Sequence, residues 1–291
     1  MPIKKSAVFF AVVLFIPALV RAQTGEINGV IEWDRMELSV VVSVNLKEAG
    51  LKLPVGRSRA EALLEDRYPD LVRPVIMGLR ADSSSTLEDL VNRGELSLAS
   101  ADNLAFQAAR IPPALSGDLS SISARYSLSL YTVGAALVKH SRLREPPGLL
   151  VPAKVRDYTG IVIIADESLP LHGRNAAALL RPCLFPKIWD SGMGLVYERS
   201  MTASETGMVC YASRESVLAR SPSGLDEKLL SRVGDNPLRI MARGVFGETP
   251  TDPIIDSEDA RIILSSQANR RLLREGRVAL VLDRSVLKTS L

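Results

Sequence analysis

The stretch from Gly160 to His172, GIVIIADESLPLH, places acidic, hydroxyl and imidazole groups directly after an apolar run. Asp166 or Glu167 could serve as a general acid or base, and either could join His172 at a metal ion. Open α/β sheets bind their ligands beyond the carboxyl ends of their strands. A hydrolytic or ligand-binding enzyme with its site near Asp166, Glu167 and His172 is therefore one interpretation of the stretch.

The rest of the sequence does not supply the parts that such a site needs. A metal site normally takes three or four protein ligands, and the chain holds only one other histidine, His140. The sequence has no GxSxG for a serine triad, no GxxxxGK[ST] for phosphate and no GxGxxG for a dinucleotide. We therefore expect polar residues that end a buried strand, with no catalytic residue, no metal and no cofactor.

The chain has two cysteines, Cys183 and Cys210, and they do not form a CxxC motif. This spacing disfavours a zinc or redox site. In an exported protein the pair can form a disulfide. Two unpaired, buried thiols fit the same spacing, and the sequence leaves both alternatives open.

Residues 1–22 have the layout of a signal peptide. Lys4 and Lys5 precede an apolar run over residues 7–20, and small residues precede Gln23, where we expect cleavage. About 14 apolar residues are too few to span a bilayer, which takes about 20. The sequence thus predicts export to the periplasm and no transmembrane span after cleavage.

Removal of the signal peptide changes the charge of the protein. Three of the 36 basic residues lie in the signal peptide and none of the 33 acidic residues does, so the mature chain would carry 33 charges of each sign. A chain without net charge has no overall field that gathers nucleic acid. We expect no nucleic-acid partner.

The pattern of apolar residues predicts two mixed halves. An N-terminal module over 23–142, a proline-rich linker over 143–157 and a C-terminal module over 158–291 follow the signal peptide. In the first module, alternation predicts strands over 27–33, 38–46 and 121–130, with 132–138 as a returning strand. Helical spacing begins at Ala60, and Pro69 and Pro74 predict a break near Arg67. Ser85 and Glu88 predict a capping box.

The second module has continuous apolar runs at 160–165 and 278–282, which predict strands covered on both faces. Residues 186–198 predict a hairpin that turns at Ser191 and Gly192. Ser257 can cap a helix that runs to Arg274. The fold class expected is α+β, with mixed α/β halves whose antiparallel or mixed sheets are packed by helices.

The segments YTGIVIIADESLPL, PCLFPKIWDSGMGLVYE and VGDNPLRIMARGVFG resemble exported envelope proteins of the flagellar assembly protein T type and the related small envelope lipoproteins. The resemblance covers about Tyr158 to Asp283. It implies non-catalytic work in the envelope, in some members as a ring around the flagellar basal body. The lipoproteins' lipidated cysteine is absent here, and the family has no catalytic motif that could be carried over.

These observations favour a non-catalytic periplasmic protein that serves as an assembly or scaffolding component, with the flagellum as a candidate location. Its expected partners are other envelope or flagellar basal-body proteins, or further copies of the chain. The alternative is the envelope enzyme centred on Asp166, Glu167 and His172.

Overall fold

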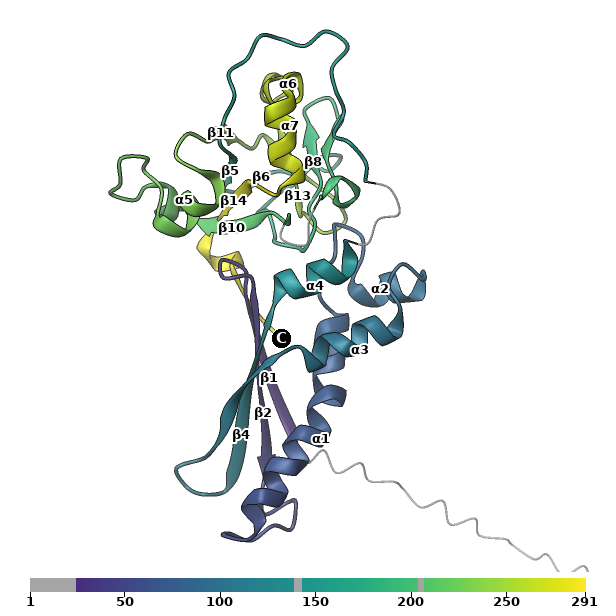
Figure 1. Ribbon diagram of the computed structural model, residues 1–291, viewed down its shortest axis with the longest axis vertical. Helices are drawn as coiled ribbons and strands as arrows, with labels where there is room; N and C mark the ends of the chain where they lie inside the picture. Colours follow the sequence, from purple (N-terminus) through teal and green to yellow (C-terminus); the bar gives the residue numbers. More distant parts are fainter. Residues whose placement is uncertain (1–24, 139–142, 204–206) are drawn as a thin grey trace, which may run out of the picture.

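The structure is a computed structural model that describes residues 25–138, 143–203 and 207–291. The expected signal peptide, residues 1–22, lies outside the described residues. Figure 1 shows two parts stacked along the long axis, a long sheet with helix α1 (Gly56–Met77) below and a part with several shorter strands and helices above. Both parts contain helices together with sheets, which are antiparallel, mixed or parallel, and this confirms the α+β class.

The lower part is built on a five-stranded antiparallel sheet. In sheet order its strands are β15 (Lys288–Ser290), β1 (Gly25–Glu32), β2 (Glu37–Asn45), β4 (Ser121–Ser129) and β3 (Ala109–Leu115). Alternation along β2 buries Leu38, Val40 and Val42, while Ser39 and Val41 between them stay half-exposed. The buried face of the sheet packs against α1 and α4 (Leu130–Leu137), and α2 (Leu87–Asn92) and α3 (Leu98–Phe106) pack beside α1 and belong to the same core.

Helix α1 continues through both of its prolines, so the break expected near Arg67 is absent. Each interior proline removes a backbone hydrogen bond and costs about 3 kcal/mol. The helix buries Leu64, Tyr68, Val72 and Ile76, and full burial of such side chains contributes roughly 1.5–3 kcal/mol each. This buried face offsets the cost of the prolines and keeps one helix.

Two further expectations in the lower part were wrong in detail. Residues 132–138 do not return as a strand, because Leu130, Val133 and Leu137 lie three and four apart and bury one face of α4. The outer partner of β4 is β3, whose prolines concealed it in the sequence and are tolerated at the sheet edge. The capping box lies one residue later than predicted, at Thr86 and Asp89.

The upper part holds a four-stranded parallel sheet. In sheet order its strands are β10 (Cys210–Ser213), β14 (Val278–Leu282), β5 (Ile161–Ala165) and β11 (Leu238–Met241). All five residues of β14 are buried, and alternate residues of the sheet join two separate apolar clusters on its two faces. This confirms the expected strands that are covered on both sides.

A second sheet and a set of helices complete the upper part. The sheet has the order β12 (Gly244–Phe246), β13 (Asp252–Ile255), β8 (Ile188–Asp190) and β9 (Leu195–Tyr197), and β8 and β9 form the predicted hairpin. The expected long helix after Asp256 is two helices, because Ser266 is extended and caps the second. The remaining elements are β6 (Leu169–Pro170), β7 (Ala177–Ala178), α5 (Glu227–Val233), α6 (Ser257–Ser265), α7 (Gln267–Arg274) and the 3-10 turns η1 (Arg199–Met201), η2 (Arg214–Val217) and η3 (Arg284–Val286).

The segment expected as a linker, 143–157, runs over the upper part, where it arches around α6 and α7 (Figure 1). The Ser265 hydroxyl accepts a hydrogen bond from the backbone of Ala153, at 3.0 Å. The Asn269 amide oxygen accepts one from the backbone of Tyr158, also at 3.0 Å. The segment is therefore held along the second half.

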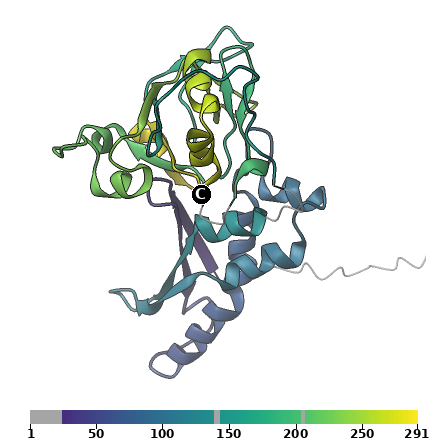
Figure 2. The same cartoon turned by 45° about the horizontal axis from the view of Figure 1, so that its top comes forward.

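Contacts between the two parts are extensive. The last strand, β15, leaves the upper part and pairs with β1 of the lower sheet. The carbonyl oxygens of Arg80 and Ala81 accept hydrogen bonds from the backbone of Leu184 and Phe185, at 3.0 and 2.8 Å. Figure 1 shows α4 directly beneath the upper part, and the turned view in Figure 2 keeps it there.

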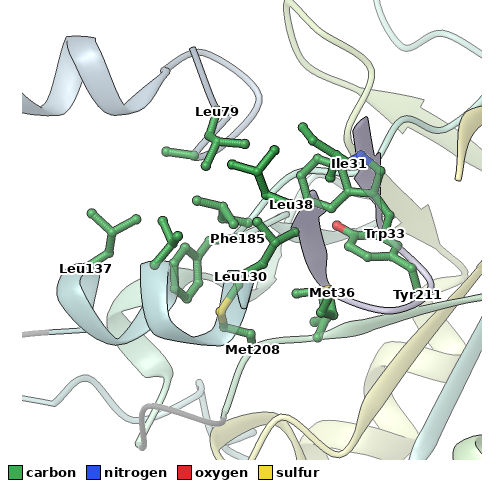
Figure 3. Close-up of a cluster of buried hydrophobic side chains, with 14 of the residues drawn as sticks. Ile31, Trp33, Met36, Leu38, Leu79, Leu130, Leu137, Phe185, Met208 and Tyr211 are labelled. Carbon is green, nitrogen blue, oxygen red and sulfur yellow. The ribbon is translucent and has the colours of Figure 1, made fainter. Parts of the chain in front are cut away.

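One hydrophobic core joins the two parts. Trp33 from the lower part meets Tyr211 from the upper part edge to face, with ring centroids 5.7 Å apart. Figure 3 shows Leu130 of α4 beside Met208 and Phe185 of the upper part. The apolar cluster around these residues runs without interruption from one sheet to the other.

Candidate functional site

Asp166 lies where the sequence placed it, at the carboxyl edge of the parallel sheet. Strand β5 ends at Ala165, which is in register with Leu282 of β14, and Leu282 is in register with Ser213 of β10. The residues that follow these strand ends therefore emerge at one level on three adjacent strands. Such an edge is where open α/β sheets bind their ligands.

The side chains at this edge are already paired with one another. The Arg214 guanidinium lies 3.1 Å from Asp166 Oδ2 and 3.6 Å from Glu167 Oε1. The Asp166 side chain is only 5% exposed, while that of Glu167 is 74% exposed. The Arg214 guanidinium thus balances the charge of Asp166, the carboxylate that a reaction at this edge would use. The ion pair covers the end of β5.

Two neighbouring carboxylates at the same edge accept local hydrogen bonds. The hydroxyl and the backbone N–H of Ser285 hold the pKa of Asp283 below its usual range. The hydroxyl of Ser213 likewise lowers the pKa of Glu215. A general acid or base at neutral pH needs a carboxyl pKa that is raised. Both shifts have the opposite direction, which fits strand ends and turn caps.

His172 stands apart from these carboxylates. Its ring meets Phe246 edge to face, with centroids 5.8 Å apart, and its backbone N–H donates to Val245 O at 2.9 Å. Within the described residues no hydrogen bond or ion pair joins His172 to Asp166 or Glu167. The structure therefore brings the two predicted carboxylates together with Arg214 and leaves the predicted histidine on a different turn.

No group of three or more metal-ligating side chains is found in the part of the chain that the structure describes. No helix among those residues is long and apolar enough to cross a membrane. His140, the other histidine, lies outside the described residues.

Cys183 and Cys210 are both buried and both free thiols in this structure. The Tyr211 hydroxyl donates to Cys183 O at 2.6 Å and accepts from Cys183 N at 3.0 Å, so Cys183 lies on the face of the parallel sheet that Tyr211 covers. Cys210 joins the apolar cluster on the opposite face. The sheet thus lies between the two sulfur atoms. Burial raises the pKa of both thiols, that of Cys210 to about 11.

A pocket of about 430 Å³ lies at the boundary between the two parts. Asp34 and Tyr131 line it from the lower part, and Lys228 and Arg232 line it from the upper part. The Lys228 ammonium donates to the carbonyl oxygen of Asp34, and the Arg232 guanidinium lies over the Tyr131 ring, 5.7 Å from its centroid. The charges of this pocket bind one half of the molecule to the other. Sequence reasoning missed them because the contributing segments lie far apart in the chain.

The comparison with family models gives two matches along the chain. Residues 24–136 match the model described as Treponema pallidum Tp0624, N-terminal domain. Residues 160–284 match Treponema pallidum Tp0624, second domain. The chain is similar to two domains of Tp0624. No curated protein matches it closely enough to count as a relative.

The match to Tp0624 overturns the resemblance to flagellar assembly protein T and the small envelope lipoproteins, which was wrong. Apart from Tyr158 and Thr159, the segments that suggested the resemblance lie within the residues that match the Tp0624 second domain. They contain the apolar strand β5, the β8–β9 hairpin, and strands β11 and β12. Continuous apolar runs are common to buried parallel strands in general, so they indicate the fold and do not identify the family.

The Tp0624 matches also show which features lie inside the similar regions. Asp166, Glu167 and His172 fall within the match to the Tp0624 second domain. The boundary pocket takes residues from both matches. Strand β15 follows the end of the second match, at residue 284.

Proposed function

We propose that this protein is a non-catalytic, exported component of the cell envelope that acts by contact with other proteins, as an assembly or scaffolding part. The observation that carries the proposal is the closure of the one predicted site by Arg214. A catalytic carboxylate must be free to exchange a proton, and Asp166 is buried against a cation. The signal-peptide layout of residues 1–22 supports export to the periplasm.

The joining of the two halves also supports a contact role. A shared core, a shared sheet and the charges of the boundary pocket hold two Tp0624-like regions in one arrangement. A body joined in this way presents several surfaces to partners and loses less conformational entropy on binding than a flexible one would.

The proposal is tested in native cells with variants of the former candidate residues. Asp166→Asn, Glu167→Gln and His172→Ala should each restore what deletion removes, because none of them alters an interaction surface of any size. Ile163→Asp is the control that loses function, since a buried unpaired charge in β5 prevents folding. If folded and exported Asp166→Asn protein behaves like the deletion, the site is catalytic and the proposal is wrong.

Export and contact have separate readouts. Mass spectrometry of the mature protein should give Gln23 as its first residue, and a retained Met1–Ala22 segment would contradict export. Crosslinking in native cells, followed by purification of the chain, should capture a defined protein partner. Crosslinks to no protein at all, in cells where the deletion has a phenotype, would contradict the contact role.

A further inference from the structure

The lower sheet has two edges, and they differ in how they are protected. Strand β3 forms one edge and carries Pro112 and Pro113 and a register shift between Ile111 and Ala114. Prolines and bulges are features that prevent a further strand from pairing with an edge. Strand β15 forms the other edge, and its sequence, Lys288-Thr289-Ser290, contains neither; its protection consists of its short length and the charge of Lys288.

The hydrogen bonds of β15 leave one side of this strand open. Trp33 N donates to Leu287 O and Leu291 N donates to Gly29 O, each at 2.9 Å, so residues 287, 289 and 291 face β1. Pairing in an antiparallel ladder alternates, so Lys288 and Ser290 direct their N–H and C=O groups away from β1. Among the described strands, only β1 pairs with β15.

A groove of about 440 Å³ runs beside this strand. Its floor is apolar, formed in part by Trp33, Leu79 and Pro182, and residues of β15 line one wall. A second space of about 430 Å³ continues it past Arg181 and Thr249. The groove therefore borders a strand that still has backbone donors and acceptors to offer.

The charged side chains that line the groove are all cationic, namely Arg80, Arg181 and Lys288. Arg80 and Arg181 form no ion pair in the described part of the chain, and the third, Lys288, lies 3.6 Å from Glu32. The acidic residue that lines the continuation of the groove is Glu248. Two unpaired guanidinium groups beside an open strand favour a partner that carries carboxylates.

We propose that β15 and this groove bind an extended, acidic segment of a partner protein, which adds to the sheet as a further strand. Its backbone would pair with Lys288 and Ser290, and its carboxylates would meet Arg80 and Arg181. Strand addition of this kind derives affinity from the backbone and specificity from alternate side chains. The inference rests on the proposed function, since an assembly component needs a surface for its partner.

The test is a fluorescence anisotropy titration of the purified mature chain with fluorescein-labelled peptides. The acidic peptide (Glu-Val)₄ should bind and the basic peptide (Lys-Val)₄ should bind at least tenfold more weakly. A (Glu-Pro)₄ peptide keeps the charge but has a proline at every second residue, which lacks a backbone N–H and disfavours pairing as a strand, and it should also bind at least tenfold more weakly. Affinity for (Glu-Val)₄ should fall as salt is raised, because exposed charges are screened.

Variants of the chain locate the binding. The double variant Arg80→Glu/Arg181→Glu should weaken (Glu-Val)₄ binding at least tenfold. Ser290→Pro removes an N–H that β1 does not use and should weaken it similarly, with the fold checked by circular dichroism. The matched control is Arg59→Glu, an exposed arginine near the opposite end of α1, which should leave the affinity unchanged.

Three results would overturn the inference: no binding of (Glu-Val)₄, equal binding of the basic peptide, or equal effects of Arg59→Glu and the groove variants. If crosslinks in native cells capture a partner at another surface while the peptide fails to bind, the proposed function stands and this groove is not its site.

Discussion

Asp252 and Asp118 are both aspartates, and their surroundings move their pKa values in opposite directions. Asp252, in β13, is fully buried, and the loss of solvation raises the pKa of its carboxyl. Asp118, in the turn between β3 and β4, is exposed, and hydrogen bonds from Ser116 and Ser120 lower its pKa to about 2. Stability should therefore depend on pH through the two groups in different ways.

Asp252→Asn should make the free energy of unfolding less dependent on pH between pH 4 and 7. A raised pKa means that the folded state holds the proton more tightly than the unfolded state, whose pKa is near 3.8. Stability contributed by the protonated carboxyl is then present below pH 3.8 and is lost as pH rises through the folded-state pKa. Urea titrations across this range give the slope for each variant.

The control for this experiment is Asp118→Asn. A lowered pKa contributes stability above pH 3.8 that is lost only as pH falls toward about 2. Between pH 4 and 7 this variant should follow the wild-type slope. If Asp252→Asn follows it as well, the buried carboxyl does not titrate in that range.

Neither Cys183 nor Cys210 should react with Ellman's reagent in the folded protein, because both thiols are buried and their pKa values are raised. Unfolding in guanidinium without a reductant should expose two reactive thiols per chain. An unfolded, unreduced protein with no reactive thiol would contain a disulfide, contrary to the placement of the cysteines on opposite faces of the sheet.

At the scale of elements, helix α1 depends on its buried face. Leu64→Ala removes a side chain that is 0% exposed between α1 and the lower sheet, and should destabilise the protein by about 2–5 kcal/mol. Leu98→Ala, at a position that is 52% exposed in α3, should change stability by less than about 0.5 kcal/mol. Denaturant titrations measure both, and equal effects would show that α1 is not held by this face.

The elements also show what the sequence could predict. Strands with clean alternation, such as β2 and β4, and strands with continuous apolar runs, such as β5 and β14, were expected correctly because burial itself produces those patterns. Two predictions based on prolines were wrong. The prolines in α1 did not break the helix, and those in β3 did not prevent a strand. In both cases tertiary packing or an edge position outweighed the local preference.

The candidate site was only partly predictable for a related reason. Asp166 and Glu167 were placed correctly at a strand end, since that position follows from the chain itself. Their partner Arg214 lies 48 residues after Asp166, and no local sequence pattern predicts an ion pair over that separation. The positions of Lys228 and of β15 likewise depend on how the second half packs on the first.

At the scale of the whole molecule, the shared core predicts that the two parts unfold together. The two tryptophans report on different places, Trp33 at the boundary and Trp189 in β8 of the upper part. In the single-tryptophan variants Trp33→Phe and Trp189→Phe, fluorescence should give the same urea midpoint as circular dichroism on each variant. Separate fluorescence and circular-dichroism midpoints within one variant would show that the parts unfold independently.

The pairing of β15 with β1 has a consequence for the order of synthesis and export. Thr289 accepts a hydrogen bond from Trp33, 256 positions earlier in the chain. Strand β1 therefore emerges from a ribosome or a translocation channel well before its neighbour β15. Until β15 has been synthesised, the edge of β1 that pairs with it has unpaired backbone N–H and C=O groups, which other chains could bind. A chaperone that covers this edge would protect the nascent protein during that interval.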